Sequence, residues 1–141
     1  MTNPQINQSW WSLRITYGLV AFLAGLDKFF HVLANWDAYL SPAVVSLAPV
    51  SGSVLMRTVG VVEMAVGLLI LTQWTRIGAY LASAWLLCIA LNLVLAGSFF
   101  DVAVRDVALS VGAWTLAQLS ELRDPVSHRL TSPTTVNSAR V

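Results

Sequence analysis

The chain has 141 residues, of which 57% are hydrophobic and only 11% are charged. A soluble domain carries about 25% charged residues, so this composition is typical of a single domain that lies in lipid. The net charge of +1 provides no basic field for nucleic acid. The single cysteine, Cys88, excludes an internal disulfide and a C-x-x-C motif for zinc or dithiol chemistry.

Four segments are long and apolar enough to cross a membrane, which takes about 20 residues. They are residues 13–33, 55–71, 77–100 and 102–119. Every backbone N–H and C=O group in lipid must be paired within the protein, which favours helices, and strand-like alternation is absent. We therefore predict an all-α, integral membrane four-helix bundle at residues 1–123, with an outer loop at 34–54 and a flexible, polar cytoplasmic tail at 124–141.

The first span ends in the sequence GLDKFFHVL, which places an acid, a base and an imidazole near the end of an apolar helix. Asp27 and His31 are four residues apart, so the helical period puts them on one face, and Lys28 is three residues from His31. The charges interrupt the apolar segment, which argues against a cleaved signal peptide. We expect this span to be retained in the protein.

The loop at 34–54 is long for a connection between two membrane helices and is punctuated by Pro42, Pro49 and Gly52. Its Trp, Tyr, Val and Leu content is typical of a segment at the interface between lipid and water. We predict that the loop lies on the outer membrane surface and contains a short helix at 42–47.

The second span contains one acid, Glu63, and two glycines seven residues apart, Gly60 and Gly67, which share a helix face and predict close packing. The third span contains an amide but no charge, and the fourth begins with an adjacent Arg–Asp pair. Small residues also recur four residues apart, as in Ala21/Gly25, Gly78/Ala82, Ala79/Ser83 and Ala108/Gly112.

At a rise of 1.5 Å per residue, polar groups from all four spans fall in the outer half of the bilayer. They are Asp27, Lys28, His31, Glu63, Asn92, Arg105 and Asp106. A charge near the bilayer centre costs about 2.5–3.5 kcal/mol, so we expect Asp27 and Glu63 to be neutralised by Lys28, Arg57 or Arg105.

Two interpretations of this outer polar layer stay open. Ion pairs can hold the helices in register, or the layer can line a pocket in which Glu63, Asp27 and His31 bind a ligand or move protons. The only other histidine is His128, and the acids and the imidazole match no metal-ligand motif, so neither a haem nor a metal site is predicted.

Basic residues in the flanks of the spans predict the orientation. The amino end, the second loop and the carboxyl tail carry five, whereas the opposite side carries three, which places both termini in the cytoplasm. The five are Arg14, Arg76, Arg123, Arg129 and Arg140, and the three are Lys28, Arg57 and Arg105.

Three stretches of the chain resemble the DoxX-like family of small bacterial and archaeal membrane proteins. They are RITYGLVAFLAGLDKFFHVLANWDAYLSP, VGVVEMAVGLLIL and RIGAYLASAWLLCIALNLVLAGSFFDVAVRDVALSVGAWTLA, and together they extend over about residues 14–118. The shared features are a glycine before an acidic–basic pair, a Gly-x-x-Glu sequence and an Arg-Asp pair. The resemblance implies a four-helix membrane bundle.

Named members of that family are linked to quinone-dependent sulfur oxidation and to terminal quinol oxidases, and others associate with oxidoreductases of thiol stress. Relatives with dithiol roles need paired cysteines, and this chain has only Cys88. For quinone contact, the resemblance implies the matching positions Asp27, Lys28, Glu63 and Arg105.

We therefore expect a multi-pass subunit of a bacterial-type cytoplasmic (inner) membrane that accompanies a redox partner or a respiratory-type complex. It would contact quinone or lipid headgroups through the outer polar layer, without a catalytic motif or an intrinsic cofactor. The alternative is a purely structural accessory subunit that stabilises a larger respiratory or photosynthetic complex. A small proton-coupled transporter is disfavoured, because the spans are unbroken and show no repeat.

Overall fold

The computed structural model describes the backbone of residues 3–131 and the side chains of residues 3–123, and this part of the chain is helical without any strand. The predicted all-α class is confirmed over these residues. The elements are α1 (Pro4–Phe30), the 3₁₀-helix η1 (Trp36–Tyr39), α2 (Pro42–Leu47), α3 (Gly52–Leu71), α4 (Thr75–Ala96) and α5 (Phe100–Thr131).

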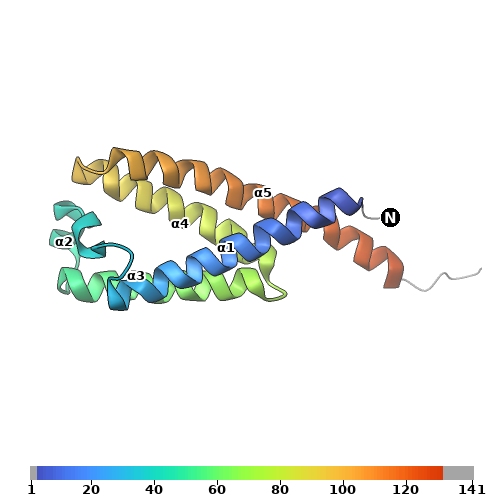
Figure 1. Ribbon diagram of the computed structural model, residues 1–141, viewed down its shortest axis with the longest axis horizontal. Helices are drawn as coiled ribbons and strands as arrows, with labels where there is room; N and C mark the ends of the chain where they lie inside the picture. The colour runs from blue at the N-terminus through green and yellow to red at the C-terminus, as the bar shows by residue number, and fades with distance from the viewer. Residues whose placement is uncertain (1–2, 132–141) are drawn as a thin grey trace, which may run out of the picture.

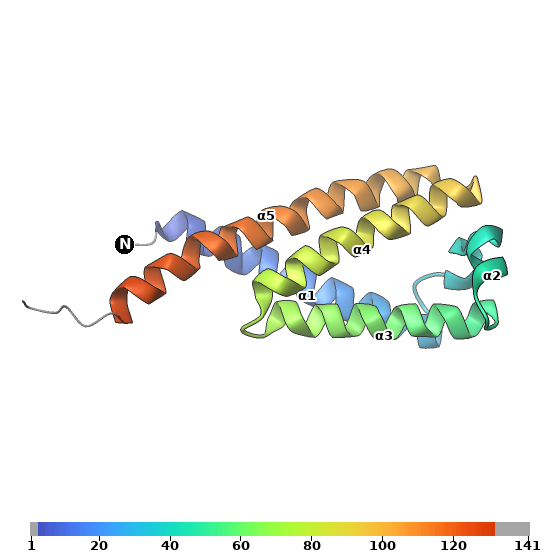
Figure 2. The ribbon, with the colours of Figure 1, turned by 180° about the vertical axis from the view of Figure 1, so that it is seen from behind.

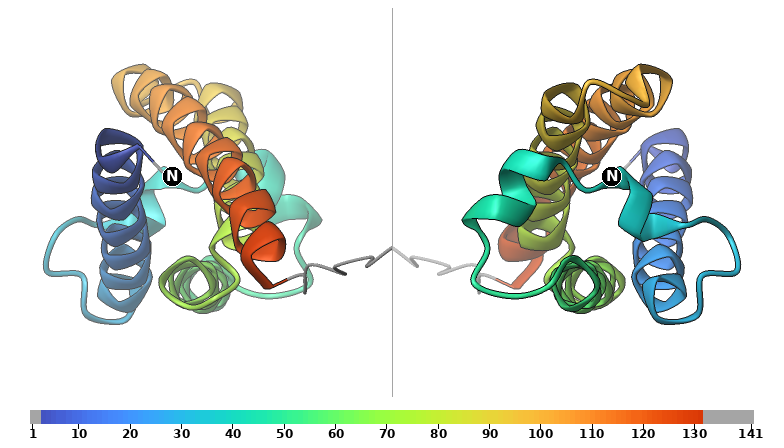
Figure 3. Two further views of the ribbon diagram at one scale, coloured as in Figure 1. Left: turned by 90° about the vertical axis from the view of Figure 1, so that its right-hand side faces the viewer. Right: turned by 90° about the vertical axis from the view of Figure 1, so that its left-hand side faces the viewer.

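The four long helices run back and forth along the long axis of the molecule (Figure 1). They form two pairs, because α1 makes its most extensive contacts with α3, and α4 makes them with α5. The pairs converge where α1 crosses α5, near the N-terminus, and they diverge toward the end at which α2 lies (Figures 1 and 2). Seen along the long axis, η1 and α2 lie across this wider end (Figure 3).

Local sequence signals explain where the helices begin and end. Pro4 occupies the first turn of α1, and the side chain of Asn3 accepts a hydrogen bond from the backbone N–H of Gln5. His31 terminates α1 in the left-handed conformation (φ 55°), and Gly97 terminates α4 in the same way (φ 68°).

Three predicted boundaries can be compared with these elements. The short helix predicted at 42–47 is α2 and is confirmed. The first span was predicted to reach residue 33, but its helix ends at Phe30. α5 continues through the first part of the predicted tail to Thr131, and residues 132–141 lie outside the described part, so the flexibility of the tail stays a prediction.

Four glycines bring the backbones of α1 and α3 together. A Cβ atom on Gly25 would lie 2.5 Å from the carbonyl oxygen of Gly60, and one on Gly60 would lie 2.6 Å from that of Gly25. Gly18 and Gly67 repeat this contact seven residues along each helix, with a Cβ on Gly67 only 2.7 Å from the Gly18 oxygen. The close packing predicted from Gly60 and Gly67 is therefore confirmed.

By length and composition, two of the described helices, α3 and α4, are apolar enough to cross a membrane. Large apolar side chains are exposed on all four long helices, however. Leu19, Val61, Leu91 and Val111 represent α1, α3, α4 and α5, and each is 46–60% exposed. Apolar surface on this scale suggests a membrane protein.

We predict that Gly60→Ala lowers the free energy of unfolding by about 1–3 kcal/mol, because the added methyl group must displace backbone of α1. Gly52→Ala is the matched control, since a Cβ there meets nothing closer than 3.6 Å. Denaturant-induced unfolding in detergent micelles measures both. Equal stability of the two variants would contradict a glycine-dependent contact.

Candidate functional site

The central contact of the candidate site is a buried ion pair between α1 and α3. The ammonium of Lys28 donates a hydrogen bond of 2.5 Å to the Glu63 carboxylate, and the two side chains are only 5% and 11% exposed. The predicted neutralisation of Glu63 by a basic residue of another span is confirmed. Such a pair is stable in a low-dielectric interior only while both partners are present.

The other two helices bring an acid and an indole to this pair. Asp106 on α5 is 4% exposed and lies within electrostatic range of Lys28 and Glu63. Trp85, midway along α4, has its buried indole N–H close to the Glu63 carboxylate, but the two groups do not meet the distance and angle of an ordinary hydrogen bond. We call Lys28, Glu63, Trp85 and Asp106 the buried polar cluster.

Along the helices, the buried polar cluster is flanked by apolar core on both sides. Val66 and Ala82 belong to the core on the side of the α3–α4 turn, and Ala90 and Ala103 belong to the core on the side of α2. Charged groups enclosed in this way are desolvated, so their mutual interactions are stronger than at a protein surface.

Asp27 has a different role from that of its neighbour Lys28. Its carboxylate accepts hydrogen bonds from the backbone N–H groups of Val32 and Leu33, both at 2.9 Å, and from the indole N–H of Trp36 at 2.8 Å. Asp27 therefore holds the chain reversal that follows α1. The prediction that a basic side chain neutralises Asp27 is wrong.

Trp36 connects this chain reversal to the buried polar cluster. The ring that donates to Asp27 also lies over the Lys28 ammonium, 3.9 Å from the ring centre. A cation over an indole face is attracted by the electron density of the ring. The adjacent residues Asp27 and Lys28 are thus linked through Trp36 rather than to each other.

Asn92 fixes the outer loop to α4. Its side-chain oxygen accepts a hydrogen bond from the backbone N–H of Ser41 at 3.0 Å, and its side-chain amide donates to the Tyr39 carbonyl at 2.7 Å. These bonds occupy the polar groups of Asn92, so this predicted ligand-binding residue serves to position the loop.

The structure does not bring His31 and Arg105 into the buried polar cluster. His31 lies beyond the end of α1, so the predicted shared face with Asp27 is wrong, and its nearest charged partner is Asp37 at 3.8 Å. Arg105 has a 61% exposed side chain and donates to its neighbour Asp106 at 3.2 and 3.3 Å. Of the seven predicted residues, Lys28, Glu63 and Asp106 converge.

Trp85 was not among the predicted site residues. A signal for it was present, because tryptophan in membrane helices is enriched at the interfaces, whereas Trp85 lies well inside the one predicted span without a charged residue. The need to bury its N–H in an apolar helix points to a polar neighbour.

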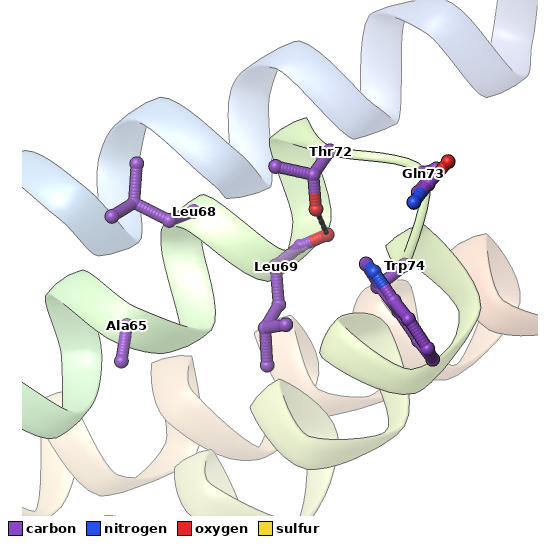
Figure 4. A pocket seen from close by; sticks show the side chains of 6 residues that line it. All are labelled: Ala65, Leu68, Leu69, Thr72, Gln73 and Trp74. Carbon is purple, nitrogen blue, oxygen red and sulfur yellow. Dashed lines mark hydrogen bonds between the residues drawn. The ribbon is translucent and has the colours of Figure 1, made fainter.

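A separate pocket lies beside the α3–α4 turn and has a volume of about 690 Å³ (Figure 4). It is open and mostly apolar, and no residue of the buried polar cluster lines it. The lining residues are Ala65, Leu68, Leu69, Thr72, Gln73 and Trp74. The described residues contain no group of three or more side chains that could hold a metal ion.

Comparison of the chain with protein-family models, curated proteins and solved structures gives no match. The resemblance to the DoxX-like family therefore stays a prediction from the sequence.

We predict that Lys28→Met lowers the free energy of unfolding by about 3–5 kcal/mol, because it leaves the Glu63 carboxylate buried without a partner. The double variant Lys28→Met/Glu63→Leu removes both charges and should recover most of this loss. Unfolding in detergent measures the coupling, and additive losses from the two single substitutions would contradict it. The control is Arg76→Gln at the exposed Arg76–Glu121 pair, which should cost less than about 1 kcal/mol.

We predict that Asp27→Asn accelerates hydrogen exchange at the Val32 and Leu33 amides, because it removes the negative charge that both N–H groups contact. Hydrogen-exchange mass spectrometry of the segment 31–36 measures the effect. Asp37→Asn changes an exposed acid of the same loop and should leave these amides unaffected. Unchanged protection in Asp27→Asn would show that the carboxylate is not needed for the chain reversal.

Proposed function

We propose that the protein is an integral membrane subunit that accompanies a redox partner and binds the headgroup of a quinone at the buried polar cluster. In this proposal all four long helices cross the membrane and both termini lie in the cytoplasm. The exposed apolar side chains of α1 and α5, together with the apolar helices α3 and α4, support this placement.

The distribution of charge supports the orientation. Around the α3–α4 turn and the crossing of α1 with α5, the described residues contain three arginines, Arg14, Arg76 and Arg123, and one acid, Glu121. Together with Arg129 and Arg140, which follow in the sequence, the basic residues of the termini and the second loop number five, against three in the other flanks. An excess of arginine on one side of a membrane protein is typical of its cytoplasmic side.

The observation that carries the quinone proposal is the buried indole N–H of Trp85, which lies close to Glu63 of the Lys–Glu pair without an ordinary hydrogen bond to it. A buried donor without a well-formed hydrogen bond costs free energy, and the cost is larger where lipid replaces water. A quinone carbonyl oxygen accepts hydrogen bonds, and a quinol hydroxyl donates to a carboxylate. The buried polar cluster offers a donor in Trp85 and acceptors in Glu63 and Asp106.

Within the proposal, the redox partner carries out the electron transfer. The chain contributes polar atoms that orient the ring oxygens, next to the apolar side chains that flank the buried polar cluster. Lys28 remains paired with Glu63, and the oxygens of that carboxyl group act as acceptors toward a quinol.

A second candidate function is that of an accessory subunit that stabilises a larger membrane complex. The observations in its favour are the polar groups that the protein satisfies internally, since Asp27 and Asn92 hold the loop and Lys28 pairs with Glu63. In that case the buried polar cluster only fixes the two helix pairs against each other.

We predict that Trp85→Phe reduces the quinone that co-purifies with the protein by about tenfold, because it removes the free donor. Trp85 makes no hydrogen bond of ordinary geometry within the described part of the chain, so the bundle should fold as before. Solvent extraction of protein purified with native lipid, followed by chromatography, measures quinone per protein. Trp114→Phe, at a 52% exposed indole, is the matched control.

A wild-type protein without quinone, or a Trp85→Phe variant that retains all of it, would contradict the quinone proposal. Co-purification with a large complex whose stability falls when this chain is deleted would then favour the accessory function. Extraction of the protein from membranes by carbonate, without detergent, would contradict the membrane placement itself.

A further inference from the structure

Two arginines from different helices lie against the same buried indole near the crossing of α1 and α5. Trp10 is 8% exposed, and its N–H donates to the Ser120 hydroxyl at 2.7 Å, which fixes the ring between the helices. The guanidinium carbon of Arg123 lies 3.6 Å from the ring centre, and that of Arg14 lies 4.9 Å from it. Two positive charges are therefore held close together.

The described side chains, residues 3–123, provide no carboxylate for either arginine. Glu121, the acid nearest to Arg123 along the described part of α5, instead pairs with Arg76 at 3.1 Å and accepts a hydrogen bond from Tyr80 at 2.7 Å. The positive charges of Arg14 and Arg123 therefore lack an acidic counterion in this part of the structure.

The two guanidinium groups differ in how they are satisfied. Arg14 donates to the carbonyl oxygens of Ile70, Leu71 and Thr72 at 2.6–3.0 Å, so the negative end of the α3 dipole offsets part of its charge. Arg123 donates no hydrogen bond to any described group. Its planar fork of N–H donors lies against the Trp10 ring and meets no acceptor among the side chains of residues 3–123.

We infer that Arg14 and Arg123, mounted on Trp10, bind the phosphate of an anionic phospholipid headgroup. A guanidinium matches a phosphate with two parallel hydrogen bonds, and a phosphate between two arginines removes their mutual repulsion. This inference rests on the proposed membrane placement, but it concerns the end of the bundle away from the loop and a different ligand.

The surroundings favour a lipid over a free phosphate ion. Trp11 packs edge-on against Trp10 at 5.0 Å, contacts Arg14, and is 44% exposed, as is typical of an indole at the level of lipid headgroups. Thr72, whose carbonyl accepts from Arg14, also lines the open apolar pocket beside the α3–α4 turn. An acyl chain attached to the bound phosphate thus has apolar surface within reach.

Native mass spectrometry of the full chain, released from micelles doped with phosphatidylglycerol or phosphatidylcholine, tests the inference. We expect the wild type to retain phosphatidylglycerol and not phosphatidylcholine, and Arg123→Gln to retain about tenfold less. Arg76→Gln removes one positive charge from the same end at an arginine already paired with Glu121, and should change retention less than twofold.

An equal loss of phosphatidylglycerol retention in Arg76→Gln and Arg123→Gln would overturn the site, because the positive charge of the surface as a whole would then explain the binding. Displacement of phosphatidylglycerol by millimolar inorganic phosphate would overturn the lipid as the source of the phosphate.

Failure of this inference is distinguishable from failure of the proposed function. Lipid retention that does not depend on Arg123, in a protein that still carries quinone, would overturn the inference alone. A protein that carries no quinone but loses phosphatidylglycerol on Arg123→Gln would support the inference and contradict the quinone proposal.

Discussion

The Lys28–Glu63 ion pair and the glycine contact beside it act as one structural unit. A Cβ on Gly25 would lie 3.0 Å from the Cβ of Glu63, and one on Gly60 would lie 3.1 Å from the Cβ of Lys28. The glycines therefore bring the two backbones close enough for the side chains to meet, and the ion pair in turn requires that distance. This mutual dependence sets the register of α1 against α3, on which the position of the other pair depends.

The loop depends on the same unit through Trp36. The indole ring rests on Lys28 and donates to Asp27, so the end of α1 and the beginning of the loop form a continuous set of contacts with the buried polar cluster. Asn92 then fixes the far side of the loop to α4. Ordering the long loop between α1 and α3 costs conformational entropy. Hydrogen bonds to buried or half-buried polar groups at two points of the loop offset this cost.

Periodicity and composition predicted the helical class, α2 and the meeting of acid and base from separate helices. These predictions failed where a single polar contact determines the local structure, as at the end of α1 and around Trp85. The prediction that Asp27 and His31 share a face assumed a helix through both residues. Instead, the Asp27 carboxylate accepts hydrogen bonds from the backbone N–H groups of Val32 and Leu33, and the helix ends before His31. Trp85 was missed because the polarity of its surroundings comes from Glu63, a residue on another helix.

The polar composition from Asp124 onward predicted a tail, whereas the helix α5 continues to Thr131. These eight residues lengthen α5 by about 12 Å at 1.5 Å per residue, and α1 likewise begins ten residues before Arg14. The two ends of the molecule therefore differ. At one end α1 and α5 extend past the α3–α4 turn, whereas at the other end the short elements η1 and α2 lie across the bundle (Figure 1). In the proposed orientation, a water-soluble protein approaching from the cytoplasm would meet these two projecting helices before it reached the bilayer.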